Sequence, residues 1–435
     1  MSKELLDKAL QLYNNGDLYA AQKCVAKILR RQPSHAAALM LQGNIFFRQD
    51  ALPNALKAYQ AALQADSTLP AIKSNIANVL FEQKDYQKAY DYAVQALDTG
   101  AEDFNALVIY GNAALELEKY NEAKAAFLQL LRIDSAYAWG YNALSRIYQK
   151  QKDFARALAY SWRALELNAD DDAHHLNFGY LLYEIADEVP RAQCEEYAQK
   201  WLTTYGTNPI VKHMASAILH CDKLSRADED YVRLIFDAFA GDFEDVLHNL
   251  DYRAPQLIAE ELETRFGAPY YKKIRILDAG CGTGLCGDFL KKYARRWQLY
   301  GVDISEKMLE IAKRKKVYNK LLQADIETCL PRKHNFFDLI VAADVLTYIG
   351  NLEKVIGHFK ELLREDGYLI FTVSKNYVDE ADYYLHDSGR FLHHRRYIEK
   401  LLANNHFRLK KISENFLRNE GDNQVMGYVI VAEKG

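Results

Sequence analysis

Small residues recur through the first half of the chain at one fixed spacing. Alanine stands at five positions, each 34 residues after the last: Ala21, Ala55, Ala89, Ala123 and Ala157. A second series at the same spacing is also small throughout: Gly43, Ala77, Gly111, Ser145 and Gly179. Antiparallel helices approach closely only where small side chains face each other, and a helix pair repeated at this period buries its open apolar face against the next pair. The period therefore predicts an all-α solenoid of stacked helix pairs.

Larger side chains follow the same period, which supports a repeating pair of helices. They stand at Val25, Tyr59 and Phe127, with the small Ala93 as the exception. Segments such as GNAALELEKYNEAKAAFLQLL resemble tetratricopeptide (TPR) repeats. About six units followed by a closing helix, PIVKHMASAIL, make up a TPR helical-repeat domain that we expect over residues 1–222.

Short β-branched runs alternate with amphipathic helices from about residue 223 to the end of the chain. The runs are KIRILDAG, QLYGVDIS, KLLQADIE, FDLIVAAD and GYLIFTVS. This alternation predicts a parallel sheet covered by helices on both faces. The last stretch, FRLKKISENFLRNEGDNQVMGYVIVAEK, predicts a terminal antiparallel hairpin that turns at NEGDN.

A glycine-rich loop follows the first of these predicted strands. The strand ends at Asp278, and Gly280, Gly282 and Gly284 come before a helix. Glycine permits a tight turn and lets a ligand approach the backbone, and the helix N-terminus adds free N–H groups. Asp303 ends the next strand, where its carboxylate can accept hydrogen bonds from a ribose diol, cap the following helix, or do both.

The alternate glycines of G-C-G-T-G differ from the dinucleotide fingerprint G-x-G-x-x-G. The strings LDAGCGTG, GVDISEKMLEIAK and FDLIVAADVL are similar to those of class I S-adenosylmethionine (SAM) methyltransferases, over roughly residues 230–435. The whole chain resembles methyltransferases that carry N-terminal TPR repeats. The resemblance implies an all-α TPR solenoid followed by an α/β Rossmann-like class I methyltransferase domain over residues 223–435. This domain would have lid helices at about 226–267, a catalytic core at about 270–435, and a mostly parallel seven-stranded sheet ending in an antiparallel hairpin.

The resemblance also implies SAM as the cofactor, S-adenosylhomocysteine as its product, and the residues that hold the methionine part. The glycine loop should face this part through the backbone of Gly280, Cys281 and Gly282. Gly284, the third glycine of the loop, is also expected in the cofactor site. Asp278 should lie near its amine. Asp303 should hold the ribose.

The adenine and the sulfonium have their own expected contacts. Ile304 and Met308 should flank the adenine, although Met308 could equally be a core residue. Asp325 should reach the adenine amino group, with Ile326 on the ring; the alternative for Asp325 is a loop acid or helix cap. Ala342 should line the floor below the sulfonium.

The segment before the first strand carries an aromatic stripe. Phe236, Phe239 and Phe243 recur at helical spacing, which fits either a lid over the cofactor or a docking face against the sheet or the repeats. Tyr252 and Arg253 are further candidates to close on the SAM carboxylate.

No catalytic residue can be assigned from the sequence, because methyl transfer needs a base only if the acceptor must lose a proton. Candidates at the mouth of the cleft are Asp344, Tyr348, His393 and His394, and for each a structural role is the stronger interpretation.

A row of asparagines in the repeats points to a partner. Asn44, Asn78 and Asn112 stand 34 residues apart, at a phase that should face the groove of the solenoid. Such a row can bind the backbone of an extended protein or peptide segment, although asparagine is also common in the repeat itself.

Composition excludes several classes of protein. The formal net charge is −4, without the basic excess of a nucleic-acid-binding chain. Six cysteines without a CxxC pair predict no metal site and suit a reducing cytoplasm. No run of 18 apolar residues occurs, and the N-terminal MSKELLDKAL lacks the apolar region of a secretory signal, so we expect no membrane segment.

Together these features predict a cytoplasmic SAM-dependent methyltransferase with an unidentified acceptor, whose TPR domain recruits a protein substrate or partner. Two alternatives stay open: an interaction scaffold with a non-catalytic SAM-binding domain, or a small-molecule methyltransferase that uses its repeats for assembly.

Overall fold

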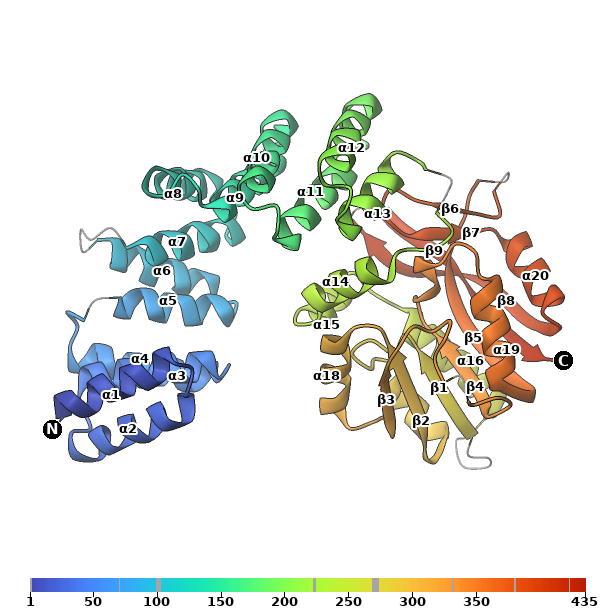
Figure 1. Cartoon of the computed structure of the whole chain (residues 1–435), viewed down its shortest axis with the longest axis horizontal. Helices are drawn as coiled ribbons and strands as arrows, with labels where there is room; N and C mark the ends of the chain where they lie inside the picture. Colours follow the sequence, from blue (N-terminus) through green and yellow to red (C-terminus); the bar gives the residue numbers. More distant parts are fainter. Residues whose placement is uncertain are drawn as a thin grey trace. The chain divides into compact units, whose positions relative to one another are not determined.

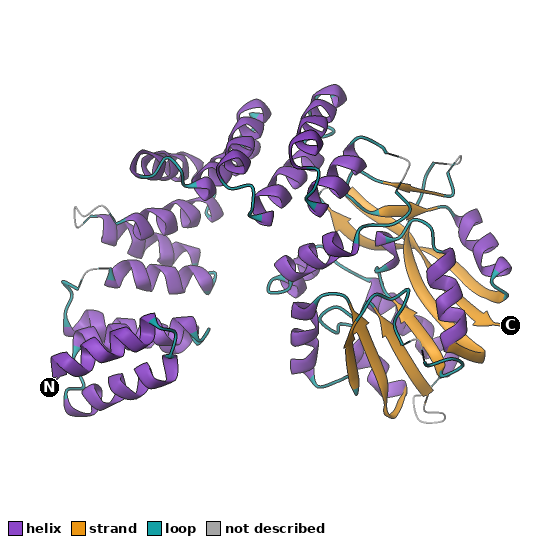
Figure 2. Ribbon diagram, viewed as in Figure 1, coloured by secondary structure: helices purple, strands orange, loops and turns teal. Residues whose placement is uncertain are grey.

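The computed structural model describes residues 2–69, 71–98, 103–221, 224–267, 274–330, 332–378, 381–421 and 423–435 (Figures 1 and 2). The chain divides into two compact units, Met1–Ala169 and Asp170–Gly435. The expected domain boundary at 222/223 and the expected start of the core at 270 lie outside the described residues.

The first unit is the predicted solenoid of helix pairs. Its helices are α1 (Ser2–Asn14), α2 (Leu18–Arg31), α3 (Ala36–Arg48), α4 (Leu52–Ala65), α5 (Ile72–Glu82), α6 (Tyr86–Leu97), α7 (Phe104–Glu116), α8 (Tyr120–Ile133), α9 (Ala138–Lys150) and α10 (Phe154–Leu167). The second helix of every pair starts 34 residues after the previous one, from Leu18 to Phe154. The period read from the sequence is therefore the period of the fold.

The small and large series are complementary across each helix pair. A Cβ added at Gly111 would lie 2.9 Å from two ring atoms of Phe127, which is too close for a side chain. Gly43 faces Tyr59 in the same way. In the repeat between them the equivalent positions are Ala77 and Ala93, and both are completely buried. Ala93, the exception in the aromatic series, is therefore matched by an alanine where the other two repeats have glycine.

This complementarity predicts the effect of enlarging Gly111. Gly111→Ala should lower the free energy of unfolding by about 1–3 kcal/mol, because the new methyl group overpacks against the Phe127 ring. In a Phe127→Ala background the same change recreates the natural Ala77–Ala93 pair and should cost little. Denaturation followed by helical circular dichroism measures all four proteins of this cycle. An equal loss of stability in both backgrounds would contradict the close contact between Gly111 and the Phe127 ring.

The second unit begins with three further helices, α11 (Asp172–Glu184), α12 (Arg191–Tyr205) and α13 (Pro209–Ile218). The sequence assigns them to the repeats, and they share one compact unit with the α/β part of the chain. Ala217 of α13 packs with Leu385 and Phe391 in a small apolar cluster.

The α/β part contains nine strands in one sheet within the described residues: β1 (Ile274–Ala279), β2 (Ala294–Asp303), β3 (Lys320–Gln323), β4 (Phe337–Ala342), β5 (Leu363–Lys375), β6 (Tyr383–Leu385), β7 (Phe391–His393), β8 (Phe407–Glu420) and β9 (Asn423–Lys434). The order is β3-β2-β1-β4-β5-β7-β6, with β9 also beside β5 and β8 beside β9. Strands β1 to β5 are parallel, and β8 and β9 form the predicted antiparallel hairpin. The short β6 and β7 add to the seven expected strands.

Helices cover both faces of this sheet, as the alternation predicts. The helices of this part of the chain are α14 (Glu229–Phe239), α15 (Phe243–Asn249), α16 (Ala254–Phe266), α17 (Gly287–Tyr293), α18 (Glu306–Lys315), α19 (Glu353–Leu362) and α20 (Arg395–Asn404), with a short 3₁₀ turn η1 (Leu346–Tyr348). Successive strand residues alternate between faces: Ile276 packs with α16 and α17, while Leu277 packs with α19 and α20. Both layers are apolar and buried.

Among the helices in the described ranges, none combines the length and the apolar character needed to cross a membrane.

Candidate active site

The glycine loop after β1 is tightly folded. Gly280, Gly282 and Gly284 have φ angles of +71°, +51° and +88°, a region that suits glycine. The N–H groups of Gly280 and Cys281 both donate to the carbonyl of Val302 on β2, at 2.8 and 3.0 Å. A side chain at Gly280 would strike Val345. In contrast, a Cβ at Gly282 would meet only Phe243, at 3.7 Å, so the space before this residue is open.

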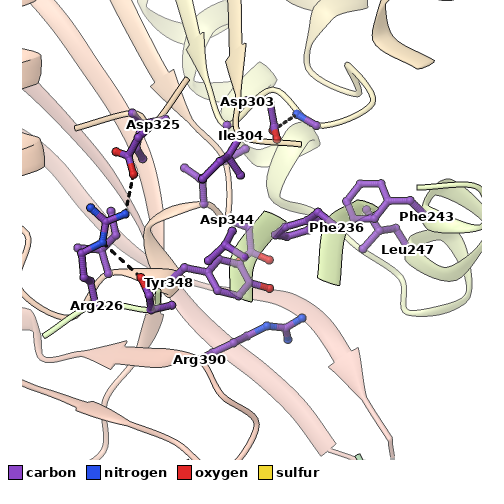
Figure 3. A pocket seen from close by; sticks show the side chains of 18 of the residues that line it. Arg226, Phe236, Phe243, Leu247, Asp303, Ile304, Asp325, Asp344, Tyr348 and Arg390 are labelled. Carbon is purple, nitrogen blue, oxygen red and sulfur yellow. Dashed lines mark hydrogen bonds and ion pairs between the residues drawn. The ribbon is translucent and has the colours of Figure 1, made fainter. Parts of the chain in front are cut away.

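That space is part of a cavity at the carboxyl ends of the parallel strands (Figure 3). The space within it is about 950 Å³ when the open solvent at its mouth is included. Six of the expected cofactor residues line it: Gly280, Gly282, Asp303, Ile304, Asp325 and Ile326. These residues come from the carboxyl ends of three neighbouring strands and the loops that follow them, which is where open α/β sheets bind ligands.

Asp303 connects the glycine loop to the start of α18. Its Oδ2 accepts a hydrogen bond from the Gly282 N–H at 2.8 Å, and its Oδ1 accepts from the Ser305 N–H at 2.9 Å. Burial raises the pKa of the Asp303 carboxyl, against the opposing effect of these backbone hydrogen bonds. The cap of α18 is Ser305, whose Oγ accepts from the Met308 N–H at 3.1 Å. Asp303 therefore fixes the loop and also presents a carboxylate to the cavity.

Asp325 is held by a charged partner that the sequence did not reveal. Arg226 donates from Nη2 to Asp325 Oδ2 at 2.6 Å, and from Nη1 to Glu327 Oε2 at 2.5 Å. Burial opposes ionisation of Asp325, but the Arg226 hydrogen bond and the Glu327 N–H outweigh it and hold the pKa of Asp325 below its usual value. The carboxylate stays ionised at the cavity wall, beside the apolar side chain of Ile326.

The other five expected cofactor residues lie outside the cavity lining: Asp278, Cys281, Gly284, Met308 and Ala342. Asp278 is buried and accepts from the Tyr318 hydroxyl at 2.5 Å; burial raises its pKa to about 7. The side chains of Cys281, Met308 and Ala342 are also buried, and Ala342 belongs to the sheet core. The residue after Ala342, Ala343, lines the cavity instead. The expected roles of these five in cofactor binding stay predictions.

Helices α14 and α15 cover the cavity with part of the aromatic stripe. Phe236 and Phe243 line it, whereas Phe239 is 38% exposed. The Ser305 hydroxyl donates to Asp237 on α14 at 2.6 Å, which ties this cover to the loop that carries Asp303. Tyr252 also lines the cavity, while Arg253 is exposed.

Two of the four candidate bases line the cavity, and two have structural roles. Asp344 and Tyr348 are in the lining. His393 is buried, and its Nε2 lies 2.9 and 3.1 Å from the carbonyls of Ile349 and Gly350; burial lowers its pKa to about 4. His394 caps α20 by accepting from the Arg396 N–H at 3.1 Å.

The cavity also contains a buried charge cluster that the sequence did not show. Arg418 of β8 is 1% exposed and donates to Asp344 Oδ2 at 2.8 Å. Arg418 and Arg390 both reach Glu420 Oε2, at 3.5 and 3.0 Å. Asp344 and the two arginines line the cavity. Asp344 has a φ of +53°, an uncommon backbone conformation for a residue other than glycine.

The asparagine row of the solenoid is partly buried. Asn44 Oδ1 accepts a hydrogen bond from the Tyr59 hydroxyl at 2.7 Å, so this side chain supports the repeat itself. Asn78 and Asn112 are also half-buried. Their role in binding a peptide stays a prediction.

Cysteines and the other residue types that can bind a metal are dispersed in the described parts of the chain. All six cysteines are free thiols. Within the part of the chain that the structure describes, no three His, Cys, Asp or Glu side chains gather in a way that could hold a metal ion.

Comparison with known families agrees with this division of the chain. Residues 277–371 match a family described as "Methyltransferase domain". Residues 6–70, 104–137 and 140–171 match families described as "Tetratricopeptide repeat". The chain therefore carries tetratricopeptide repeats followed by a methyltransferase domain.

Individual relatives match one part of the chain or the other. Over 132 residues, 29% of this chain and 46% of the relative, it is 32% identical to malonyl-[acyl-carrier protein] O-methyltransferase of Legionella pneumophila. Over 187 residues, 39% of each chain, it is 27% identical to the DnaJ homolog subfamily C member 7 homolog of Schizosaccharomyces pombe. The chain spans less than half the length of either relative. A solved structure, 1,6-didemethyltoxoflavin-N1-methyltransferase of Burkholderia thailandensis, aligns with 47% of this chain and 87% of its own, at 18% identity and a TM-score of 0.38.

Proposed function

We propose that the chain is a SAM-dependent methyltransferase that acts on an unidentified acceptor, and that its TPR repeats recruit a protein substrate or partner. The observation that carries the proposal is the position of Asp303. Its carboxylate lines a cavity inside the methyltransferase domain and is anchored to the glycine loop at Gly282.

The residues around the cavity fit the proposed cofactor. Asp303 supplies acceptors for ribose hydroxyl groups, and Asp325 supplies an acceptor for an amino group on the same side. Ile304 and Ile326 offer apolar surface to a planar base, and the open space before Gly282 admits a chain against the backbone. When bound, SAM supplies a methyl group that is already activated on a sulfonium.

The protein's own contribution to the transfer is then mainly alignment and exclusion of water. Phe236 and Phe243 line the cavity from α14 and α15 and give it an apolar wall. Asp344 is held by Arg418 rather than left as a free base. We therefore infer that the reaction needs an acceptor that reacts without strong general-base assistance.

S-adenosylhomocysteine binding tests the proposal. At 100 times its Kd, this ligand should stabilise the unit that binds it by about 2.7 kcal/mol, seen as a saturable rise in melting temperature. NADH is the matched control, because a dinucleotide site would respond to it and this site should not. No shift at millimolar S-adenosylhomocysteine would overturn the cofactor assignment. Labelled methyl transfer from SAM into cell extract, to protein or to small molecules, would then separate the enzyme from a non-catalytic scaffold.

A further inference from the structure

Arg390 lies at the end of the cavity away from Asp325. It comes directly before β7, at the end of the loop 386–390 that connects β6 to β7. Its side chain extends beside Tyr348 and Asp344 (Figure 3). A cation thus lines the part of the cavity that the proposed cofactor contacts do not use.

The loop that carries Arg390 is firmly held. His213 Nε2 of α13 lies 2.8 Å from the Gly389 carbonyl, and Arg191 of α12 forms an ion pair with Asp387. The His386 N–H donates to the Arg390 carbonyl at 2.9 Å and closes the turn. Gly389 has a φ of +75°, which suits glycine at this tight position. The side chain of Arg390 therefore projects from a fixed backbone.

Arg390 retains donors for a ligand. Its Nη1 donates to Glu420, and Tyr348 is its other hydrogen-bond partner among the described residues. A guanidinium has five N–H donors, so Arg390 keeps donors beyond these two contacts, and it lines the cavity. Arg226 is different, because both of its Nη atoms already bind carboxylates, Asp325 and Glu327. Arg390 is thus the cavity arginine better suited to an external anion.

The surroundings select the kind of anion. Asp344 is engaged by Arg418, and Glu420 is shared between Arg418 and Arg390, so two arginines face two carboxylates. The two positive and two negative charges cancel, so a monoanion meets less repulsion from Asp344 and Glu420 than a phosphate dianion does. A carboxylate also matches the planar fork of a guanidinium with two parallel hydrogen bonds.

We propose that Arg390 binds a carboxylate group of the methyl acceptor at this end of the cavity. The proposal rests on the proposed function, because it assigns the substrate class of the same site. The apolar side chains of Phe236, Phe243 and Leu247 line the cavity as well and suit an alkyl chain attached to that carboxylate.

Simple probes test this site in protein saturated with S-adenosylhomocysteine. Hexanoate should give a saturable rise in melting temperature, while hexanamide, of nearly the same shape but uncharged, and hexyl phosphate should bind at least tenfold more weakly. Equal binding of hexanoate and hexanamide, stronger binding of hexyl phosphate, or no response to millimolar hexanoate would each overturn the proposal. A protein that fails to bind S-adenosylhomocysteine contradicts the proposed function instead.

Variants locate the binding on Arg390. Arg390→Gln should weaken hexanoate binding at least tenfold, and Arg390→Lys, which keeps the charge without the fork, should lie between it and the parent protein. Arg395→Gln, at an exposed arginine of α20 paired with Glu399, is the matched control and should bind normally. If Arg390→Gln folds poorly, the Arg390→Gln/Glu420→Gln pair removes both charges together. Unchanged hexanoate binding in folded protein of either kind, with S-adenosylhomocysteine affinity retained, would reject the role of Arg390.

Discussion

Asp303→Ala is expected to lower the affinity for S-adenosylhomocysteine by about 100-fold or more. Two hydrogen bonds from ribose hydroxyl groups to a buried carboxylate contribute about 1.5–3 kcal/mol each, and 100-fold corresponds to about 2.7 kcal/mol. The variant also loses the hydrogen bond that the Gly282 N–H donates to the Asp303 carboxylate, so the glycine loop loosens at the same time. Isothermal titration calorimetry measures the affinity directly.

Two further variants separate binding from folding. Asp303→Asn keeps an oxygen acceptor without the charge, and we expect an affinity between those of the alanine variant and the parent protein. Asp288→Asn, at an exposed aspartate in the first turn of α17, should bind normally. A folded Asp303→Ala protein that keeps its affinity would remove Asp303 from the cofactor site.

Arg418→Met is expected to have the largest effect on stability, a loss of about 3–5 kcal/mol. Removing one partner of a buried ion pair leaves the other charge buried without compensation. Here the change leaves Asp344 without its 2.8 Å ion pair and Glu420 with Arg390 as its remaining arginine. Urea denaturation of the full chain, followed by the transition of the α/β unit, gives the change in free energy.

The double variant Arg418→Met/Asp344→Asn is the control for this effect. It removes both charges and should recover a large part of the loss.

A pH dependence gives a second readout. Burial raises the pKa of Glu420, but Arg390 and Arg418 outweigh it and lower the net value. Ionised Glu420 therefore stabilises the folded protein at pH values above its unfolded pKa. This stabilisation is lost as the pH falls through the lower pKa that Glu420 has in the folded protein. Arg418→Met should reduce this acid-dependent loss of stability. An unchanged pH profile would contradict the interaction between Arg418 and Glu420.

Local patterns in the sequence predicted the solenoid and one end of the site. The 34-residue period fixed where the second helix of each pair begins, because close helix contacts require small residues such as Gly43 and Gly111 at regular positions. Strand ends indicated Asp303 and Asp325, since an acidic residue directly after an apolar run lies at the carboxyl edge of a parallel sheet.

The other end of the site depends on contacts between residues far apart in sequence. Arg418 meets Asp344 across 74 positions, and Arg226 meets Asp325 across 99. No local periodicity marks such pairs, because each arginine by itself looks like an ordinary solvent-facing residue of a strand or loop. The short strands β6 and β7, which place Arg390, also lack the length that makes a strand recognisable from its pattern.

The anchoring of the 386–390 loop by α12 and α13 has a consequence for how such a chain can be recombined. A methyltransferase domain detached at residue 223 would leave behind His213 and Arg191, the side chains that hold the backbone before Arg390. The division between the two compact units lies instead between α10 and α11, and an exchange of repeats at that point keeps these contacts. Gain, loss or replacement of repeats before residue 170 leaves the contacts of α12 and α13 with the 386–390 loop unchanged. Helices α12 and α13 would be inherited together with the loop that they hold.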